Sequence, residues 1–527
     1  MRSSRLVLII MIVITTLTAL TAISRAEDKP YVPPDFLQSP PALPPGYDAA
    51  SVWRLDLPEA LAIAMKHNLG ISLARQNVEI ARLGAASAKA SMYEPTITAD
   101  YSHGSSTTPP PTAQAGAPGT AITGTNDSWD LTLGQRLPTG AQVSVSTQGG
   151  RAASSSGTAV YPLDYTSNVS FSIRQPLLRG FSLDLAIPQM AILTAQLGSE
   201  AARRGFETTA AALVQTTEAA YWDLVSALYQ YDLAVKAHKV AEDTVVLTRR
   251  QIAAGLLPAS NLTAAESERA RYRIAVLSAE ATITSSSDAL RTTLALPRDQ
   301  WSRPLLPTDK PRFEPAVVTS IDDALATAIK HRPEIAQADL ALQSSVLSMR
   351  RAENDKLPDI GIGLNTTVYC QDPSYPGVLS GLGRHDNTGW SATVNLSWTP
   401  LGQASRIAEK TARIQHESTI IARQQLVQDI WSAVRGAIRQ QQAAALQLTA
   451  ASQARILAKQ ALDNENRKYL SGDSTNTAIA EFQKRLAEAE VAELGQLLAH
   501  QRAATALLMT TGRLLEARHI QVTASAP

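Results

Sequence analysis

The residues DLPEALAIAMKHN, from Asp56 to Asn68, have the pattern of an amphipathic helix, and SIDDALATAIKHR, from Ser320 to Arg332, spells nearly the same pattern again. The two copies lie 264 residues apart. The matching positions are Ala60 and Ala324, Leu61 and Leu325, Ala64 and Ala328, Lys66 and Lys330, His67 and His331, and Ile71 and Ile335. Self-similarity at a fixed distance marks a duplicated unit, so the sequence predicts two internal structural repeats.

Each copy runs into a proline, Pro95 or Pro358, after which apolar and polar residues alternate as in a strand with one apolar face. A second alternating stretch ends at Pro176 in the first half and at Pro400 in the second. The first half holds about 39 extra residues between these prolines, rich in Gly, Ser, Thr and Pro. They include an apparent hairpin at residues 129–147, with a turn at Pro138-Thr139-Gly140.

A long helical stretch follows in each half, at residues 188–254 and 405–470, and each ends at a glycine, Gly255 or Gly472. At about 1.5 Å per residue such a helix reaches on the order of 100 Å, so it needs a partner along its whole length. Apolar residues at alternating steps of three and four continue beyond each glycine, which predicts antiparallel coiled coils. A second apolar stripe on the same helices favours a closed wall of several coils.

The run from Trp390 to Trp398 places Trp390, Ala392, Val394, Leu396 and Trp398 on one face and polar residues on the other. At about 3.3 Å per residue it spans roughly 26 Å, close to the apolar band of about 25 Å on an outer-membrane barrel. A soluble β-sandwich is the alternative. Because a few strands cannot close a sheet alone and exposed edges invite pairing, the pattern favours a barrel shared by several chains.

The remaining segments complete the predicted plan. Residues 1–26 have the charged start, apolar run and small-x-small end of a signal peptide, although the run is also long enough for a membrane anchor. The predicted parts are a Pro-rich linker at 27–53, a first repeat at 54–296 (strands about 95–175, turn near 255), a connector at 297–319, a second repeat at 320–513 (strands about 358–400, turn near 472) and a tail at 514–527.

Composition and the absence of known motifs argue against several classes of function. Acidic and basic residues nearly balance, at 47 and 48, so no basic face for nucleic acid is indicated. Cys370 is the single cysteine, which excludes an internal disulfide. No catalytic motif is present, so an enzyme is not expected. His67 and His331 recur together, but each follows a lysine at a helix end, where a capping or surface role is favoured over metal binding.

Together these features resemble the TolC family of outer-membrane efflux proteins, the outer membrane factors. The resemblance covers almost the whole mature chain. It rests on the duplicated helix openings, on the strand-to-helix segment from Gln175 to Gly180, and on the turns from Gln251 to Leu256 and from Tyr469 to Gly472.

The resemblance implies a homotrimer with a mainly α chain: a long antiparallel coiled-coil α-barrel in the periplasm, and a transmembrane β-barrel of four strands per chain, twelve in all. It further implies a Gram-negative outer-membrane channel of a tripartite efflux or type I secretion system, without cofactor. Such a channel is a passive conduit, opened when a periplasmic adaptor and an inner-membrane pump dock. A non-conducting coiled-coil envelope scaffold or a surface adhesin is the alternative.

The resemblance also assigns residues to roles. Tyr469, Glu481 and Asn261 are the pore or gate candidates, Gly255, Leu256 and Gly472 mark the adaptor-docking turns, and Trp390 and Trp398 belong to the membrane girdle. Family members often carry acidic residues just after the second turn, where this chain has Ala478 and Glu481, so any negative ring is thinner here. The hairpin at 129–147 replaces a single loop, and protrusion outside the cell is favoured over a wider barrel.

Overall fold

The computed structural model describes residues 34–521 apart from 35, 36, 38, 39, 46, 48–51, 110–120, 157–160, 314–319, 386 and 472. The predicted signal peptide, most of the predicted linker, the end of the tail and the turn residue Gly472 lie outside the described residues. In the described part, no helix combines the length and the apolar character needed to cross a bilayer.

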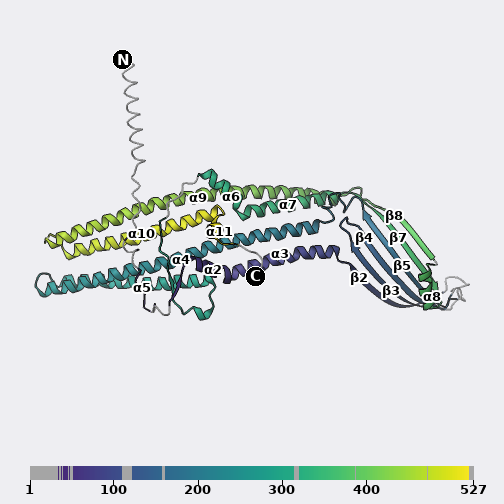
Figure 1. Cartoon of the computed structure of the whole chain (residues 1–527), viewed down its shortest axis with the longest axis horizontal. Coiled ribbons are helices and arrows are strands. Elements are labelled where there is room, and N and C mark those ends of the chain that lie inside the picture. Colours follow the sequence, from purple (N-terminus) through teal and green to yellow (C-terminus); the bar gives the residue numbers. More distant parts are fainter. Residues whose placement is uncertain are drawn as a thin grey trace, which may run out of the picture. The chain divides into compact units, whose positions relative to one another are not determined.

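Both halves contain two helices, then strands, then a long helix and a returning helix (Figure 1). The first half contains α2 (Leu57–His67), α3 (Leu69–Tyr93), β2 (Thr96–Thr108), β3 (Ile122–Arg136), β4 (Gln142–Ser154), β5 (Leu163–Pro176), α4 (Met190–Ala253) and α5 (Ser260–Leu294). The second contains α6 (Ile321–His331), α7 (Pro333–Asn354), β7 (Asp359–Asp372), α8 (Tyr375–Arg384), β8 (Asn387–Ser397), α9 (Gln403–Leu470), α10 (Asn476–Thr510) and α11 (Leu514–Ala517). Strands β3 and β4 occur only in the first half and α8 only in the second. The expectation of a mainly helical chain with an antiparallel sheet is confirmed.

The two duplicated segments form helices of equal length, α2 and α6, with 11 residues each. Asp56 caps α2, because its side chain accepts a hydrogen bond of 2.8 Å from the Glu59 amide. Ser320 stands at the same place before α6, where its hydroxyl oxygen lies 3.4 Å from the Asp323 amide. His67 and His331 occupy the last turns, where a positive charge is favourable to the helix dipole.

The chain divides into two compact units. The helical unit comprises residues 1–69, 211–328 and 432–520, and the sheet unit comprises residues 70–210, 329–431 and 521–527. The boundaries fall inside the long helices α4 and α9, so each of these helices contributes to both units.

In the helical unit, α4 and α5 form one antiparallel hairpin and α9 and α10 form another (Figure 1). An ion pair of 2.6 Å between Arg249 and Glu266 links the first hairpin near its turn. A buried ion pair between Arg455 and Glu493 links the second. One apolar core joins all four helices, and its members include Tyr221, Leu224, Leu228, Ile283, Leu290, Leu294, Leu448, Leu494 and Leu497.

The predicted connector contributes to this core through a small sheet that the sequence patterns did not indicate. Strand β6 (Leu305–Pro307) pairs in parallel with β1 (Trp53–Leu55). The buried hydroxyl of Tyr221 donates a hydrogen bond of 2.7 Å to Asp309, and burial together with this bond raises the pKa of the tyrosine. The connector is therefore tied to the middle of α4.

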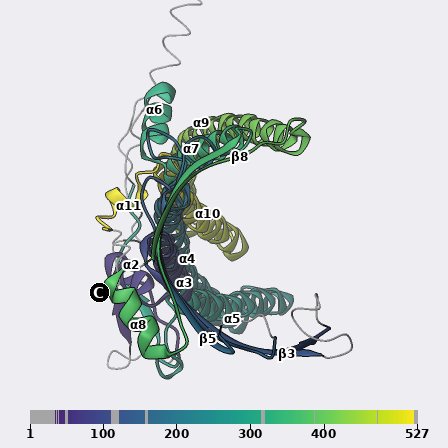
Figure 2. The same ribbon diagram turned by 90° about the vertical axis from the view of Figure 1, so that its right-hand side faces the viewer.

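The sheet unit contains one antiparallel sheet with the strand order β2-β3-β4-β5-β7-β8. Figure 2 shows it as a curved arc. The expectation of four strands is wrong, because the described residues form six. The expectation that the extra hairpin protrudes is also wrong: β3 pairs with β2 from Ile122 to Gly134, and β4 pairs with β5 from Gln142 to Ala153. These two ladders insert the hairpin into the sheet.

The turn of the inserted hairpin is fixed against the strand-to-helix segment. The Thr139 hydroxyl donates to Gln175 Oε1 at 2.9 Å, and Gln175 Nε2 donates to the Thr139 carbonyl at 3.1 Å. Gly140 has a φ of +85°, and a Cβ there would come within 3.2 Å of the Gly180 carbonyl oxygen. The turn therefore needs glycine for its backbone conformation and for its close approach.

Candidate functional site

One face of the six-stranded sheet is apolar from edge to edge. Because directly paired residues in an antiparallel sheet share a face, the register assigns every side chain to one of the two faces. The apolar face carries Ile97, Ala99 and Tyr101 of β2, Trp129, Leu131 and Leu133 of β3, Val143 and Val145 of β4, Val169, Phe171 and Ile173 of β5, Ile362, Leu364 and Val368 of β7, and Trp390, Ala392, Val394 and Leu396 of β8. We call this set the apolar band.

The opposite face is polar and internally hydrogen-bonded. Hydroxyl groups meet across neighbouring strands at Ser102 and Ser128 (2.7 Å), at Ser144 and Ser172 (2.6 Å) and at Ser146 and Ser170 (2.6 Å). The pairs involving β3 and β4 show that the inserted hairpin follows the same alternation as the other strands. A sheet with one mainly apolar and one mainly polar face is suited to separate two different solvents.

The girdle candidates Trp390 and Trp398 lie near the two ends of β8. Trp390 is 81% exposed, and Trp398, just beyond the last residue of the strand, is 62% exposed. Sequence reasoning missed a second aromatic pair on the apolar band, because Tyr101 and Trp129 are direct cross-strand partners. Both residues occupy alternate positions with the apolar residues that follow or precede them in the sequence, and this alternation could have placed them on the apolar face.

Both edges of the sheet are open in the single chain. Among the described residues, β2 pairs with β3 alone and β8 with β7 alone, and every residue of both strands is exposed. Each edge presents a row of backbone donors and acceptors over 13 and 11 residues, respectively. Such long edges are suited to pairing with another strand.

The first turn ends α4 with a glycine cap. Gly255 has a φ of +74°, its amide donates to the Ile252 carbonyl at 2.9 Å, and the Leu256 amide donates to the Gln251 carbonyl at 2.9 Å. This is the Schellman arrangement, which satisfies the last carbonyls of a helix. Leu256 is 73% exposed, so the turn presents an apolar side chain to its surroundings.

The second turn, 217 residues later, contains the equivalent of the Leu256–Gln251 bond. The Ser471 amide donates to Arg467 at 3.1 Å and the Asp473 amide donates to Lys468 at 2.8 Å. The Ser474 hydroxyl donates to Glu465 at 2.6 Å and lowers the pKa of that carboxyl group. The Schellman-type bond is present at both turns, although Gly472 itself is not among the described residues.

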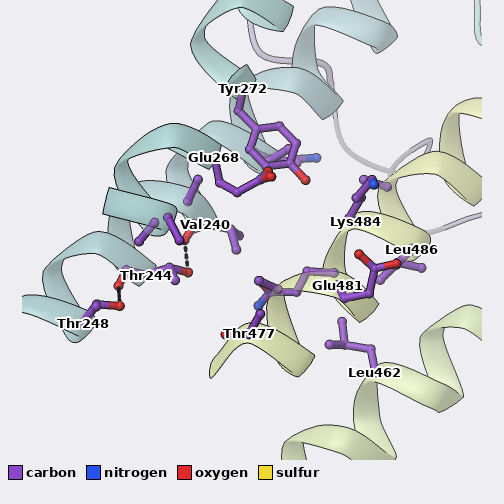
Figure 3. A pocket seen from close by; sticks show the side chains of 18 of the residues that line it. Val240, Thr244, Thr248, Glu268, Tyr272, Leu462, Thr477, Glu481, Lys484 and Leu486 are labelled. Carbon is purple, nitrogen blue, oxygen red and sulfur yellow. Dashed lines mark hydrogen bonds between the residues drawn. The ribbon is translucent and has the colours of Figure 1, made fainter. Parts of the chain in front are cut away.

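A groove of about 420 Å³ lies between the two helical hairpins near these turns (Figure 3). The gate candidates Asn261 and Glu481 both line it, whereas Tyr469 does not. Apolar residues and charges share its walls: Lys236, Val240 and Thr244 of α4, Glu268 and Tyr272 of α5, Leu462 of α9, and Lys484, Leu486 and Glu490 of α10. We call this cavity the hairpin groove.

Two carboxyl groups in the hairpin groove differ in environment. Glu481 is half exposed and accepts a hydrogen bond of 3.1 Å from Arg485 one turn along α10, so its charge is partly balanced. Burial raises the pKa of Glu490 above the usual value of a glutamate, although Lys236 and Arg455 oppose the shift. Of these two carboxyl groups, Glu481 is therefore paired with a neighbouring cation, and Glu490 is costly to ionise.

Tyr469 joins the two hairpins at their turn ends. Its hydroxyl accepts a hydrogen bond of 2.8 Å from Gln251 Nε2, a residue of the last turn of α4. Tyr469 and Gln251 are separated by 218 residues in the sequence. The bond is the kind of contact that holds two hairpins together and breaks when they separate.

Comparison with known families assigns the second half of the chain directly. Residues 324–513 match the family described as "Outer membrane efflux protein". The resemblance to the TolC family of outer-membrane efflux proteins is thereby confirmed. No curated protein matches the chain. The matched family is one of efflux proteins and not of enzymes.

Solved structures of outer membrane channels have a similar fold over most of the chain. The Campylobacter jejuni CmeC outer membrane channel has a TM-score of 0.63 at 14% identity, over 87% of this chain and 86% of that one. The Vibrio cholerae outer membrane protein VceC has a TM-score of 0.62 at 15% identity, over 86% and 96%. The open state of the Neisseria gonorrhoeae MtrE channel has a TM-score of 0.61 at 19% identity, over 87% and 89%.

Proposed function

We propose that three copies of this chain form one outer-membrane channel that serves as the passive conduit of a tripartite efflux or type I secretion system. The main support for this proposal is the six-stranded sheet. It is apolar on one face and polar on the other across all six strands, and both of its edges are open. In a bilayer such edges must be satisfied, because lipid offers no hydrogen bonds. Pairing of β2 in one copy with β8 in the next leaves no open edge in the sheet.

Closure by three copies gives a barrel of eighteen strands, since each contributes six. This is wider than the twelve strands expected from the resemblance. Barrel diameter grows roughly in proportion to strand number, and barrels of about 16–18 strands enclose a water-filled channel. The polar face, with its paired serines, lines the water, and the apolar band contacts lipid. The inserted hairpin thus enlarges the bore within the membrane.

The helical unit supplies the gated end of the conduit in the periplasm. The Gln251–Tyr469 hydrogen bond holds the two hairpins together in the closed packing. A periplasmic adaptor docks at the turns containing Gly255, Leu256 and Gly472 and enters the hairpin groove, and an inner-membrane pump supplies the cargo. An adaptor that contacts the separated hairpins more extensively than the closed ones shifts the equilibrium toward the open state. Asn261 and Glu481 then face the path of the cargo.

Conductance distinguishes this function from that of a non-conducting envelope scaffold or surface adhesin. Purified protein is inserted into a planar bilayer, and current is recorded for the wild type and for the Gln251→Ala, Tyr469→Phe double variant. A channel conducts, with larger or more frequent openings once the bond is removed. If neither protein passes current although both insert, the chain is a scaffold.

A further inference from the structure

Helix α8 lies against the apolar face of the sheet, on the convex side of the arc in Figure 2. It contacts β5 and β7, and the Tyr165 and Tyr375 rings meet edge to face with their centroids 6.3 Å apart. Ser167 and Cys370, direct partners on the apolar face, are only 5% and 7% exposed. Residues of the apolar band on the same strands remain open, such as Leu364 at 52%. The helix therefore covers one end of the band.

The two sides of α8 differ. Val378 and Gly381 are buried and face the strands, whereas Tyr375 and Leu379 are 49% and 53% exposed. Gly377 lies directly against the Asp372 carboxyl group, where a Cβ would overlap it unless that side chain moved. The exposed side thus presents Leu379 to the surroundings, whereas the half-exposed Tyr375 ring also contacts Tyr165 of β5.

Both ends of the helix are fixed. Asp372 accepts hydrogen bonds from the Ser374 amide (2.8 Å) and hydroxyl (2.7 Å), and Ser374 caps α8 by accepting from the Gly377 amide at 3.3 Å. At the other end His385 adopts a left-handed conformation with a φ of +60°, directly after Arg384 in the last turn. The capped ends and the buried side hold the helix flat on the sheet as a defined surface element.

We propose that α8 is an interfacial helix that binds lipid of the outer leaflet, with Tyr375 and Leu379 at the boundary between acyl chains and headgroups. The inference rests on the proposed function, which gives the apolar band to lipid. α8 is continuous with that band and lies where β5 begins and β7 ends, the end of the sheet that the proposed channel directs to the cell exterior. Interfacial helices insert their apolar side about 5–10 Å into this boundary.

Spin labels at three positions test the proposal in the full-length protein reconstituted into phospholipid vesicles. Cys370 is replaced by alanine, and a nitroxide is attached at Leu379→Cys, Leu364→Cys or Asn365→Cys. Leu364 lies in the apolar band and Asn365 on the opposite, polar face, so the neighbours are matched controls. Collision with oxygen reports lipid, and collision with a water-soluble nickel chelate reports water.

We expect the Leu379 label to resemble that at Leu364, with an oxygen-to-nickel collision ratio several-fold above that at Asn365. A water-like ratio at Leu379 beside a lipid-like ratio at Leu364 overturns the interfacial helix and leaves the barrel intact. A water-like ratio at Leu364 instead contradicts the proposed function itself, and the helix proposal fails with it. Tyr375→Cys provides a second position on the same side of α8, with the same expected ratio.

Discussion

Gln251 and Tyr469 are joined by a hydrogen bond of 2.8 Å that links the ends of two long helices, α4 and α9, in the helical unit. Neither hairpin supplies this contact by itself. A bond between separable elements stabilises one of two packings, and its loss favours the other.

Removal of either partner should therefore open the channel to the same extent. We expect Gln251→Ala and Tyr469→Phe each to raise the open probability several-fold in planar bilayers, and the double variant to add little, because both changes remove one bond. Gln230→Ala is the matched control on α4, since Gln230 bonds Ser226 in its own helix. Fully additive effects of the two single variants would show that the residues act separately.

Glu481 and its neighbour Arg485 should change cation block in opposite directions. Glu481→Gln removes a carboxylate from the hairpin groove, so block by a trivalent cation should weaken several-fold. Arg485→Gln removes the cation that pairs with Glu481 at 3.1 Å, so block should strengthen. Single-channel current against blocker concentration measures both. An unchanged block in Glu481→Gln would refute the assignment of Glu481 to the pore.

Glu490 should make stability depend on pH. Its raised pKa means that the folded state holds a proton that the unfolded state has released, so stability falls as pH rises through the window between the two pKa values. Glu490→Gln removes this loss. We expect the variant to unfold at a higher temperature than the wild type at neutral pH and at the same temperature in acid, as followed by circular dichroism. A difference that persists unchanged in acid would contradict the ionisation as its cause.

Arg518 should be essential to stability although it lies near the C-terminus. It donates to the buried Glu218 at 2.5 and 3.0 Å, and Thr505 donates to the same carboxylate at 2.7 Å. Arg518→Ala leaves a buried charge without its cation, which costs about 3 kcal/mol. The thermal midpoint should fall by several degrees, whereas Arg82→Ala, which breaks an exposed pair within α3, should leave it unchanged. Equal midpoints for both variants would show that Arg518 does not compensate the buried charge.

Cysteines on the two open edges should link three copies and no more. In a Cys370→Ala background, one cysteine at Thr98 of β2 is combined with single cysteines scanned along β8. We expect one register of β8 to give oxidation-dependent dimer and trimer bands on denaturing gels, because β2 meets β8 of the next copy. Bands larger than a trimer, or no bands in any register, would reject closure by three copies.

Local patterns predicted most elements of this chain. The long helices predicted at residues 188–254 and 405–470 are α4 at 190–253 and α9 at 403–470. The period of apolar residues and the turn glycine are both local properties, so the sequence alone reveals them. The positions of Asn261 and Glu481 just after the two turns also predict that they lie near each other, and both line the hairpin groove.

Helix α8 escaped sequence reasoning because its local signals are weak. It has 10 residues, and Gly377, Gly381 and Gly383 lower its intrinsic tendency to form a helix. It forms because Val378 is buried against the strands and because Ser374 caps it. Packing on β5 and β7 therefore stabilises a helix that its intrinsic propensity alone would not form.

The repeated helices, the strand alternation and the two turns were thus determined by the sequence by itself, since each depends on residues close together in the chain. The place of the inserted hairpin was decided only by the tertiary structure. Protrusion and insertion share one local pattern, and pairing with β2 and β5 distinguishes them. The Gln251–Tyr469 hydrogen bond could likewise not be predicted from local sequence patterns, because its partners meet only after both hairpins have packed.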